Sequence, residues 1–347
     1  MTEPVVTEIG PQKRISFNQL LAKEPQHSLL QSWEWGELKS AFGWQAHRFV
    51  INAQGKESAL TVLSRKIPVL SRSILYSPHC SLSDEYVTEC LAEGLHAKFP
   101  RAISWKIEPV EGSSVDYFAR LGFVPGARIQ PKSTLQLDLT RSEEELSANL
   151  EMRTRYNVGL AKRRGVQVCQ ERGEDGYKIF IQLLQETSRR KGFLVHSEPY
   201  YRRMYELFVQ NGPGMIINSY YEGEPTASAF ILRFGRYAYY VLGASSPQHS
   251  KHKSTQLLQW GAILWAKADG AEIYDFWGIP ENPQPKSHLW GVYTFKAGFG
   301  GEVVTRPGAL DLPFRKLSYG LGKCLLSVYN SLRNFRARGS FRDPLET

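Results

Sequence analysis

The most informative part of the sequence for the fold is residues 274–304, YDFWGIPENPQPKSHLWGVYTFKAGFGGEVV. Its pattern predicts a buried strand, a proline-rich loop, a short aromatic helix and a glycine-flanked turn into a last strand. A single lysine, Lys296, stands between Phe295 and the glycines at 298, 300 and 301. Glycines at such positions allow a backbone to come close to a ligand.

The same order of elements occurs earlier in the chain. The strand pattern AISWKIEP at 102–109 precedes the short helix DYFARLGF at 116–123, just as EIYDFWGIP at 272–280 precedes VYTFKAGF at 292–299. Each Gly-Phe pair then leads into another strand. We interpret the two matches as one α/β unit that is used twice.

Hydrophobic periodicity predicts the remaining elements around these two stretches. The predicted helices cover residues 28–43, 85–99, 142–166, 176–193, 198–212 and 254–270. The predicted strands lie within residues 47–68, 132–139 and 215–246. The 347 residues are enough for two domains of ordinary size.

The chain is basic, with 43 Lys and Arg against 34 Asp and Glu, a net charge of +9 and a pI near 9.3. Such a balance favours a polyanionic partner, although a basic surface without a partner stays an alternative. The four cysteines have no CxxC or zinc spacing, which indicates a reducing compartment and no metal; they are Cys80, Cys90, Cys169 and Cys324.

Neither end of the chain contains an obvious membrane anchor. The N-terminal sequence MTEPVVTEIGPQKR has acidic residues and no apolar core, so it does not resemble a signal peptide. No stretch approaches the ~20 apolar residues that a membrane span needs. We therefore expect a cytoplasmic protein, and contact with the inner face of the cell membrane stays open.

The repeated unit resembles the GNAT acyltransferase fold. Typical members hold the coenzyme A pyrophosphate on a glycine-rich loop that opens a helix. The corresponding stretch here, GASSPQHSKHKSTQLLQW at 243–260, lacks those glycines and contains Lys251 and Lys253 instead. We therefore expect a donor other than acetyl-CoA and no cofactor.

Six stretches, in order along almost the whole chain, resemble the FemABX family. They are QSWEWGELK (31–39), QPKSTLQLDL (130–139), RTRYNVGLAKRRGV (153–166), YYVLGASS (239–246), LLQWGAILWAKADGAEIYDFWGIP (257–280) and HLWGVYTFKAGFGGEVV (288–304). The resemblance implies two GNAT-like α/β domains in tandem, with mixed sheets flanked by helices. Domain 1 would span 1–140 and be completed by the tail 305–347, and domain 2 would span 141–304 without a helical arm. The stretch SPHCSL at 77–82 departs from the family pattern.

The resemblance implies an aminoacyltransferase of peptidoglycan synthesis. Such an enzyme moves an amino acid from aminoacyl-tRNA to the stem-peptide amine of a precursor, UDP-MurNAc-pentapeptide or lipid II, and we expect a monomer. Two other hypotheses stay open. One is an N-acyltransferase of the same fold with an acyl-CoA or acyl-carrier donor, and the other is a degenerate protein that binds precursor without catalysis.

For the donor side, the resemblance makes Lys296 the catalytic candidate, with Phe295 and Tyr240 as substrate-binding residues. A fixed cation in a dry site stabilises charge that develops on an ester carbonyl oxygen far better than water does. The alternative for Lys296 is a lysine that reaches from a helix end into solvent. The tRNA-binding candidates, which could equally form a solvated helix face, are Arg153, Arg155, Lys162, Arg163, Arg164, Lys251 and Lys253.

For the acceptor side, the resemblance assigns Lys39 to the precursor phosphates and Glu108 to the acceptor amine as a base or an orienting group. His196 and Tyr200 match a family arginine and tyrosine, and Arg202 offers a charge one turn further on. The alternatives are a strand end for Glu108 and packing for Tyr200.

The last predicted feature is the tail at 312–341, in which apolar residues recur every three or four positions among basic ones. We expect its first part to pack on domain 1. We expect its basic end, 333–342, to contact an anionic membrane.

Overall fold

The computed structural model describes residues 3–321, apart from 68–70, 83, 114, 193–194, 286 and 288. The chain divides into two compact units. Unit 1 contains the residues up to Lys132 and those from Thr305 onward, and unit 2 is Ser133–Val304. The sequence analysis placed the boundary after residue 140, whereas the strand β7 (Ser133–Asp138) pairs within unit 2.

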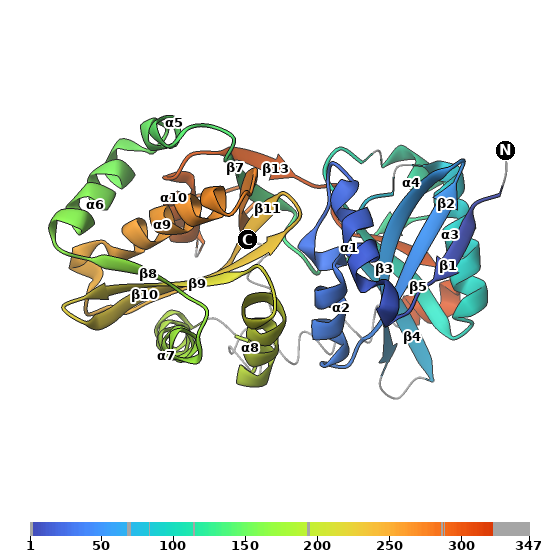
Figure 1. Cartoon of the computed structure of the whole chain (residues 1–347). Coiled ribbons are helices and arrows are strands. Elements are labelled where there is room, and N and C mark those ends of the chain that lie inside the picture. The colour runs from blue at the N-terminus through green and yellow to red at the C-terminus, as the bar shows by residue number, and fades with distance from the viewer. Residues whose placement is uncertain are drawn as a thin grey trace. The chain divides into compact units, whose positions relative to one another are not determined.

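Unit 1 is built on a seven-stranded sheet (Figure 1). All its neighbouring strands are antiparallel except β4 and β5, which are parallel. In spatial order the strands are β1 (Val5–Glu8), β2 (Gln45–Ala53), β3 (Lys56–Ile67), β4 (Arg72–Cys80), β5 (Ala102–Pro109), β14 (Leu310–Pro313) and β6 (Val124–Pro125).

Helices cover both faces of this sheet. On one face α1 (Arg14–Lys23) and α2 (Trp33–Ser40) contact β2 and β3, and the turn η2 (Leu29–Gln31) contacts β4. On the other face α3 (Glu85–Lys98) packs Leu91 and Leu95 into the core, beside α4 (Asp116–Arg120). The Asp84 side chain begins α3 by accepting the Val87 N–H at 2.8 Å.

Unit 2 has a second seven-stranded sheet. In spatial order its strands are β8 (Gln167–Glu171), β9 (Met215–Tyr221), β10 (Glu224–Phe234), β11 (Tyr237–Ser245), β12 (Ile273–Ile279), β7 and β13 (Glu302–Thr305). The long helix α9 (Ser254–Ala268) and α6 (Met152–Arg163) cover one face, and α7 (Glu174–Lys191) covers the other (Figure 1). The other helical segments described in this unit are α5 (Glu143–Ala148), α8 (Glu198–Tyr205), a π-helical turn at Glu206–Gln210, the 3-10 turn η4 (Ser250–His252) and α10 (Trp290–Ala297).

The two sheets have the same topology. In each, four antiparallel strands lead to one parallel pair, β4–β5 or β11–β12. A strand from elsewhere in the chain, β14 or β7, then lies between the parallel pair and the last strand. The expected fold class, a tandem of GNAT-like α/β units with mixed sheets, is confirmed.

Two local predictions were wrong. The helix predicted over 142–166 is broken between α5 and α6, where the Glu151 N–H donates to the Gly298 carbonyl instead of continuing the helix. The helical stripe predicted from Phe314 begins later, at 316, because the strand Leu310–Pro313 pairs with β5 and the Phe314 N–H still donates to the Ile103 carbonyl. The rest of the predicted tail stripe, including its proposed membrane end, lies outside the described residues.

Candidate functional site

Lys296 lies in the last turn of α10, beside two strands that are irregular at the same level. In β11 the register against β10 shifts next to Tyr240, and in β12 the register against β7 shifts between Asp275 and Gly278. Among the described residues, β11 and β12 pair only from Tyr237 to Tyr239. Bulges of this kind re-aim side chains and are common next to active sites.

The ammonium of Lys296 is held within unit 2 rather than in solvent. Its Nζ donates to the Gly278 carbonyl at 2.7 Å and lies 6.0 Å from the Tyr240 ring centre. The residue is only 8% exposed, so the alternative of a solvent-reaching lysine is not what the structure shows. Burial lowers the pKa of Lys296 from its ordinary value of 10.5 to about 8, although the nearby Asp275 opposes this shift.

Asp275 fixes the backbone opposite Lys296. Its carboxylate accepts the Thr134 hydroxyl at 2.5 Å, the Gln136 amide at 3.1 Å and the Trp277 N–H at 2.7 Å. Trp277 has a φ of 61°, a conformation that a bulky side chain rarely adopts without support. Thr134 and Gln136 were missed by the sequence analysis, because only the pairing of β7 with β12 brings them to Asp275.

The glycines of the motif serve the packing of the protein itself. A Cβ on Gly298 would lie 2.3 Å from Thr154 Oγ1, and one on Gly301 would lie 2.5 Å from the Gln136 carbonyl oxygen. In the YYVLG stretch, a Cβ on Gly243 would overlap the Tyr240 hydroxyl. Close approach is therefore required at these positions, but the neighbour is another segment of unit 2 rather than a ligand.

A pocket of about 690 Å³ opens in unit 2 between α6, α10 and the start of α9. It combines two cations and the Glu151 carboxylate with aromatic rings, amides and hydroxyl groups, and the cations and rings suit a nucleotide. Its lining contains the predicted residues Arg153, Lys253 and Phe295, together with Trp290, Tyr293, Asn157, Gln256 and Thr294, which were not predicted. Lys253 is the residue before α9, where no side chain caps the helix.

The other predicted tRNA contacts are exposed, but two of them also bind the backbone. Arg155 donates to the carbonyls of Ala148 and Leu150 at the end of α5. Arg164 donates to the carbonyl of Lys251, which ties the end of α6 to the loop before α9. Lys162, Arg163 and Lys251 are also exposed.

The segment around α8 is more internally bonded than the sequence suggested. His196 stacks on Tyr200, with ring centres 4.0 Å apart, and Tyr200 is buried. Arg202 forms a two-pronged ion pair with Glu174, at 2.5 and 2.7 Å, and lies 4.1 Å from the Tyr177 ring centre. A binding role for these residues therefore stays a prediction, and Arg202 would have to share its charge with Glu174.

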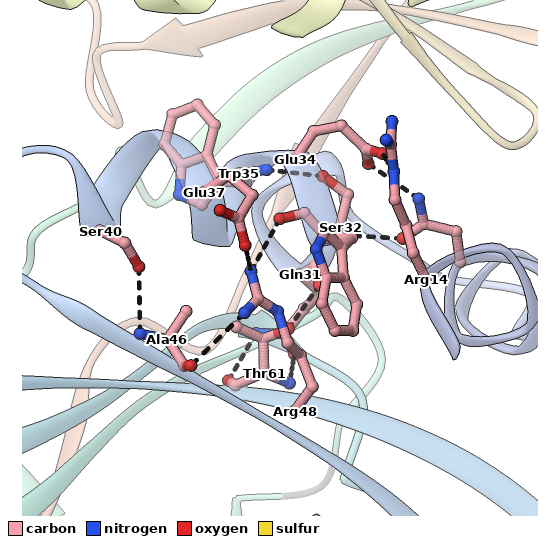
Figure 2. Close-up of polar contacts among 12 residues, drawn as sticks. Arg14, Gln31, Ser32, Glu34, Trp35, Glu37, Ser40, Ala46, Arg48 and Thr61 are labelled. Atoms are coloured by element: carbon pink, nitrogen blue, oxygen red, sulfur yellow. Dashed lines mark hydrogen bonds and ion pairs between the residues drawn. The ribbon is translucent and has the colours of Figure 1, made fainter. Parts of the chain in front are cut away.

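In unit 1, Lys39 lies at the end of α2 with its ammonium 5.5 Å from the Trp35 ring centre. Burial lowers its pKa to about 8, and the positive charge of Arg65 adds to the shift. Figure 2 shows how α2 is fixed to the sheet. Arg48 stacks 3.9 Å from the Trp33 ring and donates to the Trp33 carbonyl and the Glu37 carboxylate.

Glu108 is buried at the end of β5, at 3% exposure. Its carboxylate accepts the Tyr76 hydroxyl and the N–H groups of Ile129 and Gln130, at 2.7 and 3.0 Å. Near it the departing stretch 77–82 contains His79 with a φ of 39°, where the pairing of β4 with β5 is irregular. Glu108 thus orders a loop of unit 1, and its catalytic role stays a prediction.

Two tandem α/β units of this topology define a tandem GNAT-like fold. The crystal structure of FemX has it, with a TM-score of 0.83 and 21% identity over 92% of this chain and all of that one. A tandem GNAT protein from the clavulanic acid pathway has a TM-score of 0.55 and 11% identity over 90% of this chain and 98% of that one.

The sequence matches the FemAB family over residues 121–217 and 213–326, and the chain belongs to this family. Lipid II:glycine glycyltransferase of Staphylococcus haemolyticus is 23% identical over 86% of this chain and 90% of that protein. The enzyme of that name from Staphylococcus saprophyticus is 24% identical over 83% and 88%. The family and the class of enzyme predicted from the sequence, a transferase of amino acids, are confirmed.

No helix among the described residues combines the length and the apolar character needed to cross a bilayer. Within the same residues, no three His, Cys, Asp or Glu side chains are grouped as metal ligands.

Proposed function

We propose that the protein transfers an amino acid from aminoacyl-tRNA to the stem-peptide amine of a peptidoglycan precursor. The observation that carries the proposal is the buried Lys296 ammonium beside the irregular strands β11 and β12, in a chain of the FemAB family. The relatives named as lipid II:glycine glycyltransferases support lipid II as the acceptor.

In the proposed step, the acceptor nitrogen attacks the ester carbonyl carbon, and negative charge develops on the carbonyl oxygen. A new amide bond forms as the bond to the tRNA ribose oxygen breaks. An ammonium has three N–H groups, and among the described residues the Gly278 carbonyl takes one. We propose that another N–H of Lys296 binds the charged oxygen, where the low local dielectric strengthens the interaction.

The unit 2 pocket is the proposed site for the 3′ end of the tRNA. Arg153 and Lys253 supply charges for phosphates, and Trp290, Tyr293 and Phe295 supply ring faces for bases. The exposed cations of α6 extend this surface for sequence-independent phosphate contacts. A lysine at the uncapped start of α9, in place of a glycine-rich loop, argues for this donor over coenzyme A.

The test is a transfer assay with purified protein. Mixed aminoacyl-tRNAs would be supplied with either lipid II or UDP-MurNAc-pentapeptide, and the precursors would be weighed by mass spectrometry. We expect one precursor to gain the mass of one amino acid residue, and no gain with uncharged tRNA. Product from an acyl-CoA donor, with none from any charged tRNA, would contradict the proposal.

A further inference from the structure

Arg65 is a cation of unit 1 that the assigned roles leave out. It lies near the end of β3, with its side chain exposed, and its guanidinium is 5.4 Å from the centre of the Trp44 ring. The Trp44 ring packs against Tyr76, with centres 5.9 Å apart, and the Tyr76 hydroxyl donates to Glu108. Arg65 is thus connected through two aromatic rings to the proposed acceptor-amine residue.

Arg65 also acts on Lys39. Its positive charge is one of the two causes that lower the pKa of Lys39, the other being burial. Within the described part of the chain, no carboxylate forms an ion pair with Arg65, whereas Arg14 pairs with Glu34 and Arg120 with Glu85. Trp44 links the two residues, because its N–H donates to the Lys39 carbonyl at 3.2 Å and its ring lies beside the Arg65 guanidinium. Two neighbouring cations that repel each other gain from an anion between them.

The two cations approach from different elements. Lys39 comes from α2, which Arg48 of β2 fixes to the sheet through the Trp33 carbonyl and the Glu37 carboxylate. Arg65 comes from β3 of the same sheet. An ammonium on a fixed helix and a planar guanidinium on a strand complement each other, because the first binds as a point charge and the second binds two oxygens at once.

We propose that Arg65 and Lys39 together form an anion subsite that binds the diphosphate of the precursor. This inference rests on the proposed function, because it assigns a residue to the acceptor of that reaction. A diphosphate diester carries two negative charges, which match the two cations. The group is shared by the nucleotide-linked and the lipid-linked precursor, so both are tested.

The experiment measures binding without tRNA, so that catalysis is not required. Wild type, Arg65→Met, Lys39→Met and the double variant are titrated with UDP-MurNAc-pentapeptide and with a short-chain lipid II in detergent. We expect each single substitution to weaken binding of the true acceptor by about 10- to 100-fold, the range of one charge-assisted contact. The double variant should lose less than the product of the two, because both cations bind one group.

Lys66→Met is the matched control. Lys66 is the next residue of β3, is also exposed and carries the same charge, but its side chain points to the opposite face of the sheet. It should bind like wild type, and thermal unfolding should confirm that all variants fold. If Lys66→Met and Arg65→Met lost the same binding affinity for the precursor, the effect would come from net charge alone, and the inference would be overturned.

The inference and the proposed function fail in different ways. If Arg65→Met binds and reacts with both precursors like wild type, the subsite assignment is wrong while the transfer reaction stands. If wild type binds neither diphosphate precursor, the proposed function fails as well.

Discussion

Lys296 is a charged group whose burial opposes folding and whose proposed task needs that burial. Lys296→Met keeps most of the stem volume and removes the charge. If the ammonium acts mainly in the transition state, kcat should fall by about 100-fold or more with acceptor binding nearly unchanged. Lys296→Arg should recover only part of the lost kcat, because a planar guanidinium does not have the shape of a compact ammonium. Near-normal kcat in Lys296→Met at saturating substrate would show that the lysine has a structural or binding role.

The lowered pKa of Lys296 predicts a pH dependence of activity. Because burial brings the pKa down to about 8, the reactive ammonium is lost as pH rises through that value. The kcat of wild type should therefore decline above about pH 8, measured at saturating substrates. In Lys296→Arg the decline should move to higher pH, since a guanidinium stays protonated. A decline at the same pH in both proteins would assign it to another group.

The same shift predicts a pH dependence of stability with the opposite direction. Between about pH 8 and 10.5 the unfolded chain binds a proton at Lys296 that the folded chain does not, so the free energy of unfolding should rise with pH across this window. Lys39, whose pKa is also lowered to about 8, contributes to the same rise, so Lys296→Met should show a smaller rise rather than none. The variant should be roughly 1–2 kcal/mol more stable than wild type at pH 7, because the gain from removing a buried charge exceeds the loss of the bond to Gly278. Urea unfolding at pH 7 and pH 10 would measure both effects. A rise of equal size in the variant would contradict the prediction.

Site residues could be predicted from the sequence where their contacts lie close together along the chain. Lys296 and Phe295 could be predicted because motif and role lie within a few residues. Asp275 could be suggested, but its partners Thr134 and Gln136 could not, because they are about 140 residues away in sequence and meet it only through the pairing of β7 with β12. Arg65 was missed for the same reason, since its neighbours Trp44 and Lys39 come from other elements.

At the scale of the element, α2 shows how a helix is fixed by one arginine. Gly36 lies where a Cβ would come within 2.5 Å of Arg48 Nη2 and 3.0 Å of the Ala46 Cβ. Gly36→Ala should therefore displace Arg48 from its stack on Trp33 and destabilise the protein by about 1–3 kcal/mol, despite the better helix propensity of alanine. Denaturant unfolding measures the change.

Gly94 is the matched control for that prediction. It also lies inside a helix, α3, but a Cβ there would meet nothing within 4 Å. Gly94→Ala should thus stabilise the protein by up to about 1 kcal/mol. The two substitutions are the same chemically, so changes of opposite sign in the free energy of unfolding would be due to the packing of Arg48. A stabilising Gly36→Ala would refute the proposed close fit.

Periodicity predicted the long elements and failed where tertiary contacts end them. The long helix α9 was found because its apolar pattern is continuous. The break between α5 and α6 was not, because it depends on a hydrogen bond from Glu151 to Gly298, far along the chain. Phe314 was assigned to a helical stripe, although its N–H donates to the Ile103 carbonyl and the helix begins only at 316.

At the scale of the whole molecule, the two units differ in how the chain supplies their sheets. Every strand of unit 2 lies within residues 133–305, whereas unit 1 needs β14 from 310–313. In β14, Asp311 is buried and pairs with Lys106 of β5 at 2.7 Å. Residues 133–304 should fold as an isolated fragment, and 1–132 should not. Joining 305–321 to 1–132 through a flexible linker should restore cooperative thermal unfolding.

An Asp311→Ala version of the linked fragment tests the reason for that outcome. It leaves the half-buried Lys106 without its carboxylate, so it should unfold at a clearly lower temperature than the linked parent. A fragment 1–132 that unfolds cooperatively by itself would show that β14 is dispensable.

The position of β14 late in the chain also delays the completion of unit 1 during synthesis. On the ribosome, Leu310 emerges 185 residues after Pro125, the end of β6, which at ~5–20 residues per second is a delay of roughly 10–40 s. Throughout that interval the edge of β5 has no neighbour and is open to pairing with another nascent chain. The sheet of unit 2 is completed by β13, which ends at Thr305, five residues before Leu310. The sheet of unit 1, although it is translated first, is therefore completed last. A cell that synthesises many copies of this protein must protect the edge of β5 from other chains until β14 has been synthesised.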